Sequence, residues 1–256
     1  MCLILFALHA HPDYPLILAA NRDEFHARRT VPLAEWPDAP GVLAGRDAER
    51  GGTWLGVTRS GRWAAVTNFR DPTPRPPGIR SRGHLVGDFL RGNDGPAVYI
   101  RSLLPRLSEF DGFNLLVGDG AVAHWISNRA PSGVDPLSPL APGLHGVSNH
   151  LLNTPWRKVV RGKESLADLL RGDLALDESA LLDILLDDVA AADHQLPDTG
   201  VGLELERVLS SAFIRTPAYG TRSSTALLLA ADGGVRIRER RFGPDGVRTG
   251  ETRLAT

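Results

Sequence analysis

A chain of 256 residues with 42% apolar and 23% charged residues has the composition of an ordinary globular protein, which argues against a disordered chain and a membrane protein. The 29 basic and 30 acidic side chains leave a formal charge of −1, with no long block of like charge, so nucleic acid is not an expected partner. No repeat or linker divides the sequence, and we expect one layered domain over residues 1–256.

The first apolar segment, MCLILFALHAHPDYPLILAA, predicts two short strands over residues 2–8 and 16–20, joined by a turn at HPDYP. It lacks the basic flank of an export signal and the unbroken length of a membrane span, so stable membrane insertion is not expected. The single cysteine, Cys2, forms no intramolecular disulfide, and we expect a cytoplasmic location. The basic residues are nearly all Arg, a bias typical of GC-rich genomes, so we also expect a bacterial source.

Two further hairpins and a helix are predicted in the first half of the chain. The segment TWLGVTRSGRWAAVTNF places Ser60 and Gly61 between two β-rich runs, and FNLLVGDGAVAHWIS places its turn at residues 118–120. Between these hairpins, the Pro-rich residues 71–80 predict a loop, and SRGHLVGDFLRG predicts a helix with Ser81 as its N-cap.

Helices and then strands are predicted in the second half. Residues 156–192 have the pattern of helices punctuated by Gly162 and Gly172, with an apolar face that extends to Val189. After a polar loop, SSTALLLAADGGVRIRERRF predicts a hairpin, and a last strand is expected over residues 247–254. Hairpins at both ends with helices between them favour a sheet sandwich covered by helices.

Cys2 directly follows the initiator methionine, and its small side chain permits an aminopeptidase to remove Met1. Cys2 would then hold a nucleophilic sulfur and a free α-amine in one residue, and this amine, with a pKa of about 8, can serve as the base. Such a site needs no separate histidine. The structural alternative is a small apolar residue at the start of a buried strand.

Four polar residues, Asn21-Arg22-Asp23-Glu24, end the second predicted strand beside the start of the first. In a hairpin they would lie near the chain terminus, where Arg22 would favour a thiolate and Asp23 would hold the α-amine by a hydrogen bond. The structural alternative is a run of ion-paired surface residues leaving a strand.

Seven blocks occur in order along the chain: MC at the start, LILAANRDEF at 16–25, GGTWLG at 51–56, TNFR at 67–70, RGHLV at 82–86, GVSNHLLNTPWRKV at 146–159 and YGTRSSTALL at 219–228. With these blocks the chain resembles the NRDE proteins, also called the transport and Golgi organisation 2 family, which takes its name from the tetrapeptide at residues 21–24. The resemblance covers essentially the whole chain.

This family is similar in layout to the choloylglycine-hydrolase and penicillin-acylase branch of N-terminal-nucleophile enzymes. The resemblance implies an α+β fold, a four-layer αββα sandwich of two mainly antiparallel sheets. It also implies a site with a cysteine nucleophile, a nearby Arg and Asp that tune it, two asparagines that donate to an oxyanion, and a late arginine. The matching positions are Cys2, Arg22, Asp23, Asn68, Asn149 and Arg222.

The chain departs from the family in the LDTPWPK stretch, where Asn153 and Arg157 replace Asp and Pro. We expect Asn153 to cap the following helix as the Asp would. Trp54 and Trp156 are expected to be core aromatic residues, and His194 a residue of a polar loop.

Two functions follow as expectations. The first is an N-terminal-cysteine hydrolase or acyltransferase for a small linear amide or acyl substrate, which requires no cofactor. The second, implied by the resemblance, is a non-catalytic carrier of haem, acyl-coenzyme A or lipid on the same fold. A haem carrier would use Cys2, His9, His11 or Tyr219 as its ligand. His9 and His11 share a strand face at this spacing, but no third ligand accompanies them, so no metal site is predicted.

Overall fold

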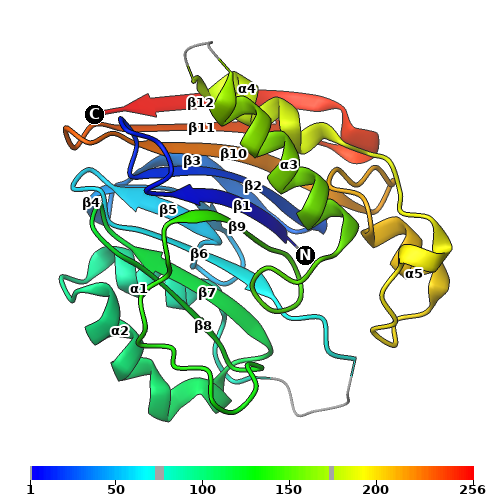
Figure 1. Ribbon diagram of the computed structural model, residues 1–256, viewed down its shortest axis with the longest axis horizontal. Coiled ribbons are helices and arrows are strands. Elements are labelled where there is room, and N and C mark those ends of the chain that lie inside the picture. Colours follow the sequence, from blue (N-terminus) through cyan, green and yellow to red (C-terminus); the bar gives the residue numbers. More distant parts are fainter. Residues whose placement is uncertain (1, 73–77, 173–175) are drawn as a thin grey trace.

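The computed structural model describes residues 2–72, 78–172 and 176–256, so parts of the predicted Pro-rich loop and helical region lie outside the description. Two six-stranded antiparallel sheets form the centre of the molecule (Figure 1). In spatial order, the first sheet contains β12 (Arg248–Ala255), β11 (Val235–Phe242), β10 (Tyr219–Leu229), β2 (Leu16–Phe25), β1 (Cys2–Leu8) and β9 (Gly143–Val147). The second sheet contains β3 (Thr30–Trp36), β4 (Ala39–Asp47), β5 (Leu55–Thr58), β6 (Trp63–Asn68), β7 (Phe113–Gly118) and β8 (Ala123–Ser127).

Helices cover the outer face of each sheet, which produces four layers in the order helix, sheet, sheet, helix (Figure 1). The second sheet is covered by α1 (Gly83–Arg91) and α2 (Pro96–Leu103), and the first by α3 (Arg157–Arg171) and α4 (Glu178–Asp183). A short helix, α5 (Leu203–Leu209), lies to one side of the sandwich. The predicted α+β four-layer sandwich is therefore confirmed.

β1 is buried on both faces, which explains its unbroken apolar sequence. Because side chains alternate along a strand, Ile4 and Phe6 point between the two sheets, whereas Leu3 and Leu5 point toward the helices. Three apolar clusters result: one between the sheets, one beneath α1 and α2, and one beneath α3 and α4. Each layer is thus joined to the next by buried apolar side chains.

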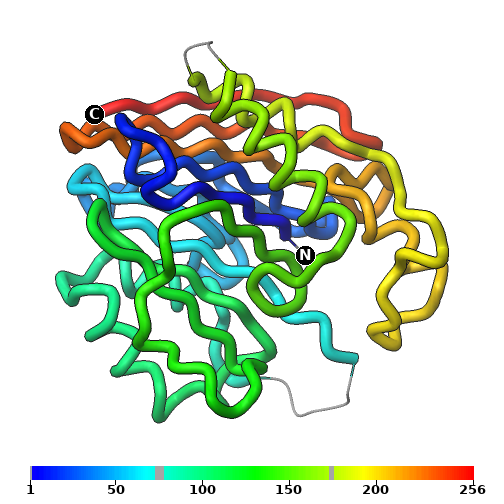
Figure 2. Tube along the Cα trace, in the orientation of Figure 1, coloured from blue at the N-terminus to red at the C-terminus, as the bar shows by residue number. Residues whose placement is uncertain are grey.

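Segments from the two ends of the chain lie side by side in the first sheet (Figure 2). β2 pairs with β1 on one side and with β10 on the other. Arg22 of β2 consequently has Cys2 as its partner in β1 and Ser223 as its partner in β10. This pairing brings the polar end of β2 beside the first residues of the chain.

Three predictions about the helices are wrong. α1 has Arg82, not Ser81, at its N-cap position, and no side chain caps it. α3 continues through Gly162, where an added Cβ would lie 2.5 Å from Leu5 Cδ1, so glycine there permits close packing on β1 rather than ending the helix. Val189 is exposed and does not extend the apolar face.

Several elements were not predicted because prolines interrupt their sequences. β3 contains Pro32, which is tolerated because β3 is an edge strand and one side of it has no hydrogen-bonded neighbour. α2 begins with Pro96, which suits the first helical position because its missing N–H would have no partner within the helix. The short strand β9 was also missed.

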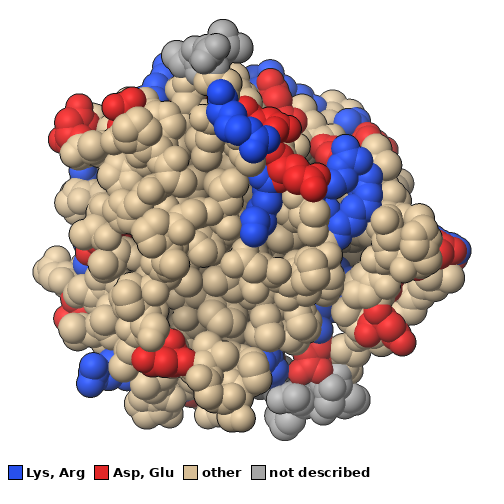
Figure 3. All heavy atoms as spheres, in the orientation of Figure 1, with Lys and Arg blue, Asp and Glu red and all other residues tan. Residues whose placement is uncertain are grey.

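The face shown in Figure 3 carries Lys and Arg side chains interspersed with Asp and Glu. No broad area of one sign appears among the described residues on that face, in keeping with the near-neutral charge of the chain. Of the helices in the described ranges, none has the length and apolar character needed to cross a bilayer.

Candidate active site

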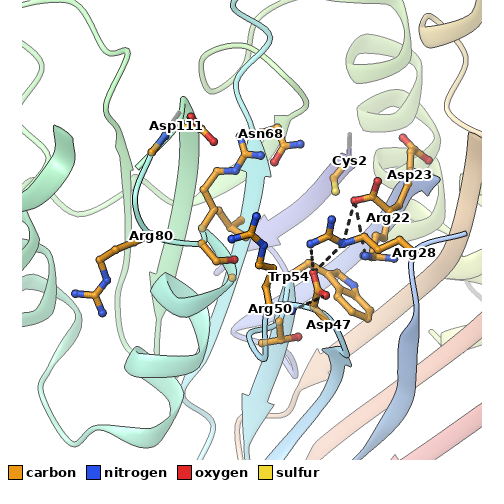
Figure 4. Close-up of a pocket in the computed structure, with 17 residues that line it drawn as sticks. Cys2, Arg22, Asp23, Arg28, Asp47, Arg50, Trp54, Asn68, Arg80 and Asp111 are labelled. Atoms are coloured by element: carbon orange, nitrogen blue, oxygen red, sulfur yellow. Dashed lines mark hydrogen bonds and ion pairs between the residues drawn. The ribbon is translucent and has the colours of Figure 1, made fainter. Parts of the chain in front are cut away.

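Cys2 is the first residue of β1 and lies at one end of the sandwich, beside a cavity (Figure 4). Its side chain is half-buried, and its backbone oxygen accepts a hydrogen bond of 3.0 Å from Ser148 Oγ. On the other side, Cys2 pairs with Arg22 of β2. The start of β1 is therefore held between β2 and the segment that follows β9, while Met1 lies outside the described residues.

The polar residues that end β2 alternate between the two faces of the first sheet. Arg22 shares the face of Cys2, because cross-strand partners point to the same side. Asn21 and Asp23 point to the opposite face, and Asp23, near the strand end, also lines the cavity. Asn21, Arg22 and Asp23 are all buried, so the alternative of an ion-paired surface run is wrong for Arg22 and Asp23, whereas Glu24 is partly exposed.

Asn21 and Asp23 make defined hydrogen bonds. Asn21 Nδ2 donates to the backbone oxygens of Leu185 at 3.0 Å and Ala212 at 2.8 Å. Asp23 Oδ1 accepts a hydrogen bond of 2.7 Å from Thr221 Oγ1. Asn21 thus joins the sheet to the segments outside it, whereas Asp23 is held in a fixed position next to the chain terminus.

The cavity beside Cys2, here called the Cys2 cavity, has a volume of about 220 Å³ and a charged wall (Figure 4). Its walls come from the ends of β1, β2 and β6, the β4–β5 connection and the segment before α1. The lining residues are Cys2, Arg22, Asp23, Glu24, Arg28, Asp47, Arg50, Thr53, Trp54, Val66, Asn68, Gly78, Arg80, Ser81, Arg82, Gly83 and Asp111.

Two arginines of the Cys2 cavity lack a carboxylate partner. Arg28 pairs with Asp47, with 2.6 Å between Nη2 and Oδ2. For Arg50 and Arg82, by contrast, no carboxylate oxygen of the described residues lies within 4.0 Å. Arg82 Nη1 donates to the backbone oxygen of Gly112 at 3.0 Å, and burial lowers the pKa of Arg82. The wall therefore offers two guanidinium groups to an acceptor-rich ligand.

Burial raises the pKa of the Cys2 thiol, and the Asp23 carboxylate acts in the same direction. The positive charge of Arg22 and a hydrogen bond from the Asp23 backbone N–H lower the pKa of the thiol but do not outweigh burial. Arg22 therefore favours the thiolate, as predicted, but burial decides the net direction of the shift. At neutral pH the thiol therefore needs a base to remove its proton.

Asn68 and Asn149, the two predicted oxyanion donors, occupy different positions. Asn68 ends β6 and lines the Cys2 cavity, and its side-chain amide has no hydrogen-bond partner among the described residues. Asn149 is fully buried and does not line the cavity, and its Nδ2 donates to the backbone oxygen of Asn68 at 3.0 Å. The structure leaves the donor role open to Asn68, whereas Asn149 fixes the backbone of Asn68.

Arg222 also differs from its expected place, because it does not line the Cys2 cavity. Its Nη1 donates to the backbone oxygens of Phe25 at 2.8 Å and Arg28 at 3.0 Å. Arg222 lies at a register shift in β10, and such bulges turn a side chain away from the regular strand direction. It borders a second cavity instead.

Two residues of the site were not predicted. Trp54 lines the Cys2 cavity, with its ring centre 4.4 Å from the guanidinium carbon of Arg22, so it is more than a core residue. Lys158 on α3 is buried, its Nζ donates to the backbone oxygen of Leu209 at 2.8 Å, and burial lowers its pKa to about 8. The signals available were the GGTWLG block for Trp54 and the rarity of lysine in this chain for Lys158.

The prediction that Asn153 caps α3 is wrong, because Trp156 occupies the N-cap position. Asn153 instead has a φ of 59°, and its Oδ1 accepts a hydrogen bond of 3.0 Å from the backbone N–H of Gly146. Asparagine tolerates this left-handed conformation better than most residues. Asn153 therefore shapes the turn that precedes the helix.

His9 and His11 lie in the β1–β2 connection, at the opposite end of β1 from Cys2. His9 Nε2 is 2.9 Å from the backbone oxygen of Ala121. Within the part of the chain that the structure describes, no group of three His, Cys, Asp or Glu side chains is placed to hold a metal ion. His194 is exposed, and it lies in a one-turn 3-10 helix, Asp193–Gln195, where a polar loop was predicted.

A cysteine at the start of a central strand, at one end of a four-layer αββα sandwich, defines the class of proteins with an N-terminal-nucleophile-hydrolase-like fold. A solved structure of a Caenorhabditis elegans N-acylethanolamine-hydrolyzing acid amidase ortholog shares this fold, with a TM-score of 0.53 and 13% identity over 89% of this chain and 92% of that chain.

The chain belongs to the Transport and Golgi organisation 2 family, whose family model matches residues 1–244. It is 38% identical to the Transport and Golgi organization protein 2 homolog of Bos taurus and 37% identical to that of Homo sapiens. Both matches cover 94% of this chain and 92% of the relative.

Proposed function

We propose that this chain is an N-terminal-cysteine amidohydrolase or acyltransferase that acts on a linear amide or acyl substrate. The observation that carries the proposal is that Cys2 lines the same cavity as Asn68, whose side-chain amide has no hydrogen-bond partner among the described residues. Acyl transfer uses a nucleophile and an oxyanion donor, and one cavity holds a candidate for each. The Caenorhabditis elegans neighbour, named as an N-acylethanolamine-hydrolyzing amidase, supports a linear amide as the substrate class.

In the proposed reaction, removal of Met1 frees the α-amine of Cys2 next to Asp23. The amine accepts the thiol proton, and the sulfur attacks the amide carbonyl to form a C–S bond. Collapse of the tetrahedral intermediate breaks the C–N bond, and the α-ammonium returns its proton to the leaving nitrogen. Water then attacks the thioester, releases the carboxylic acid and restores the thiol, whereas an amine in place of water completes acyl transfer.

Asp23 would orient the α-ammonium through its carboxylate in this scheme. Burial raises the pKa of Asp23, which opposes its ionised form, but the positive charges of Lys158 and Arg22 favour that form. The hydrogen bond from Thr221 also lowers the pKa of Asp23. We therefore assign Lys158 a supporting electrostatic role rather than contact with the substrate.

Asn68→Ala is expected to lower kcat by about 100-fold and to leave KM nearly unchanged, because an oxyanion donor acts in the transition state and not on the bound substrate. Steady-state kinetics on the best amide substrate would measure both constants. Glu35→Gln, on the exposed surface, is the control. A raised KM with an unchanged kcat would instead assign Asn68 to ground-state binding and remove its oxyanion role.

The first test of the function is the reactivity of Cys2 in two forms of the chain. One form carries Cys2 as residue one, released from a cleavable fusion, and the other retains Met1. We expect the first form to react faster with iodoacetamide at pH 7, because only this form has a free α-amine next to the thiol. For the second form the rate should still be rising above pH 9, because burial raises the pKa of its thiol.

Intact mass before and after alkylation follows this reaction, and Cys2→Ala is the control for labelling at other sites. Equal rates for the two forms would contradict the proposed role of the α-amine. The native purified chain should lack the mass of Met1, and retention of Met1 would favour the carrier function below. An amide screen follows, with N-acyl ethanolamines and N-acyl amino acids compared because Arg50 and Arg82 favour an anionic end.

The alternative proposal is a carrier of haem, acyl-coenzyme A or lipid. It rests on one observation: Cys2, a possible axial ligand, faces the Cys2 cavity. Among the described residues that line that cavity there is no His, Met or Tyr. A haem titration followed by the Soret band tests the carrier, and the absence of a Soret shift at micromolar protein would count against it. Haem binding that persists in Cys2→Ala would show that the axial ligand of the haem is a residue other than Cys2.

A further inference from the structure

A second, smaller cavity of about 80 Å³ lies next to the Cys2 cavity, and Arg22 lines both. We call it the arginine cavity, because three of its nine lining residues are arginines. Its lining residues are Arg22, Thr30, Pro32, Arg222, Ser223, Glu239, Arg241, Phe242 and Thr249. The function proposed above uses none of them except Arg22.

The register of the first sheet explains why the two cavities adjoin. Cys2 pairs with Arg22, Arg22 pairs with Ser223, and Ser223 pairs with Arg241. Cross-strand partners point to the same face, so these four side chains form one row across β1, β2, β10 and β11. The Cys2 cavity lies at one end of this row, the arginine cavity lies at the other end, and Arg22 stands between them.

Arg222 enters the arginine cavity from the register shift in β10. Its two hydrogen bonds go to backbone oxygens, and no carboxylate of the described residues lies within 4.0 Å of it. Burial and the positive charge of Arg22 both lower the pKa of Arg222, and together they outweigh the opposing effect of the Glu24 carboxylate.

The polar groups of the arginine cavity are mostly hydrogen-bond donors. Glu239 is its only acidic lining residue, and one of its oxygens already accepts a hydrogen bond of 2.9 Å from Leu33 N and lies 3.4 Å from Arg241 Nη1. Ser223 is buried, with only 5% of its surface exposed, and its hydroxyl has no partner among the described residues. Arg22 Nη1 donates to Thr30 Oγ1 at 3.2 Å, and Arg22 Nη2 lies 3.9 Å from Glu24 Oε2.

Arg241 also donates to Thr252 Oγ1 at 2.7 Å, so each of the three guanidinium groups has a hydrogen-bond acceptor, but Glu239 is the one carboxylate among the described residues that line the cavity. The buried Ser223 hydroxyl has no partner among the described residues. Buried donors without partners are costly, and arginine pairs preferentially with planar or tetrahedral oxyanions. We propose that the arginine cavity binds a small oxyanion of the phosphate or sulfate type, held by Arg22, Arg222, Arg241 and Ser223. This proposal stands on its own and does not require that Cys2 be catalytic.

Binding at the arginine cavity would also affect Cys2. An anion paired with Arg22 reduces the positive charge that favours the Cys2 thiolate. Alkylation of Cys2 is therefore expected to slow when the arginine cavity is occupied. The row of paired residues provides the physical connection between the two cavities.

The test is isothermal titration of the full chain with inorganic phosphate at pH 7 and constant ionic strength. We expect saturable binding at one site and a loss of affinity of about tenfold or more in Arg222→Gln. Ser223→Ala, which removes only a hydroxyl, is a second variant that should fold and should also weaken binding. Arg59→Gln, which removes a guanidinium from the exposed surface, is the matched control and should bind phosphate as the wild type does. Arg82→Gln tests whether the anion binds in the Cys2 cavity instead.

Absence of saturable binding would overturn the proposal, as would wild-type affinity in both Arg222→Gln and Ser223→Ala. Loss of binding in Arg82→Gln alone would place the anion in the Cys2 cavity, and this result would also overturn the proposal. Phenyl phosphate distinguishes two sources of the same chemistry: exclusion of it indicates a free ion, and binding indicates the phosphate end of a larger ligand. In the wild type, and not in Arg222→Gln, saturating phosphate should slow alkylation of Cys2.

Discussion

A Cys2→Ala variant is expected to keep the wild-type fold and to lose amide turnover by about 1,000-fold or more. The loss is large because no other thiol exists in the chain, so the variant keeps the α-amine but has no nucleophile for it to activate. The fold should persist because Cys2 is a half-buried residue at a strand end, and its backbone contacts with Ser148 and Arg22 remain. Turnover and the Tm of the variant are the two measurements.

The Cys2→Ser variant distinguishes the nucleophilic strength of the side chain from its position next to the α-amine. A serine in the same place retains the shape and the α-amine but is a weaker nucleophile, so its rate should fall between those of the wild type and Cys2→Ala. Turnover at the wild-type rate in Cys2→Ala would show that the chemistry does not use this residue. Such a result would leave the arginine cavity proposal untouched, because anion binding there does not depend on the thiol.

Glu206→Ala is expected to destabilise the protein by about 3–5 kcal/mol, because it leaves Arg70 as a buried charge without its partner. The two side chains form an ion pair and are only 5% and 4% exposed. Arg70 also lies over the ring of Trp156, with 4.8 Å between its guanidinium carbon and the ring centre. The change in free energy of unfolding, measured by urea denaturation, should be accompanied by a fall in Tm of about 6–20 °C.

Two further variants test the cause of this destabilisation. Arg70→Met combined with Glu206→Leu removes both charges and should recover most of the lost stability, because apolar side chains of similar size can replace a buried ion pair. Glu35→Ala breaks an exposed ion pair with Arg59 and should leave the Tm unchanged. If Glu206→Ala lost less than about 1 kcal/mol, the buried pair would not be the stabilising contact that its burial implies.

Much of the first sheet and of the site could be predicted from local sequence. The sequence predicts that Cys2 lies beside Arg22 and Asp23. This prediction follows from the apolar run of β1, the turn after it and the polar end of β2, and it needs no tertiary contact. The block TNFR likewise pointed to Asn68, which does line the Cys2 cavity. These predictions succeeded because neighbouring strands of a hairpin are in contact through short-range pairing alone.

The predictions that failed depend on distant contacts or on burial. Nothing local indicates that Arg222 turns away from Cys2, because the turn results from a register shift against β2, which lies far away in the sequence. Asn149 resembles Asn68 in residue type, yet only the packing of the two segments makes one line the cavity and the other support it. β3 was not predicted, because Pro32 is compatible with a strand only at a sheet edge, and that position depends on the pairing with β4.

By itself, the sequence determined the position of the thiol at residue 2. It also determined which polar residues lie close to that thiol in the predicted hairpin. Tertiary structure alone decided the protonation tendency of that thiol, since burial outweighs the nearby charge of Arg22. It also decided that Arg22, Arg222 and Arg241 meet at one cavity, because β2, β10 and β11 are brought together by long-range pairing. Solvent exclusion and cross-strand register arise only when the layers assemble, and no local pattern of residues encodes either one.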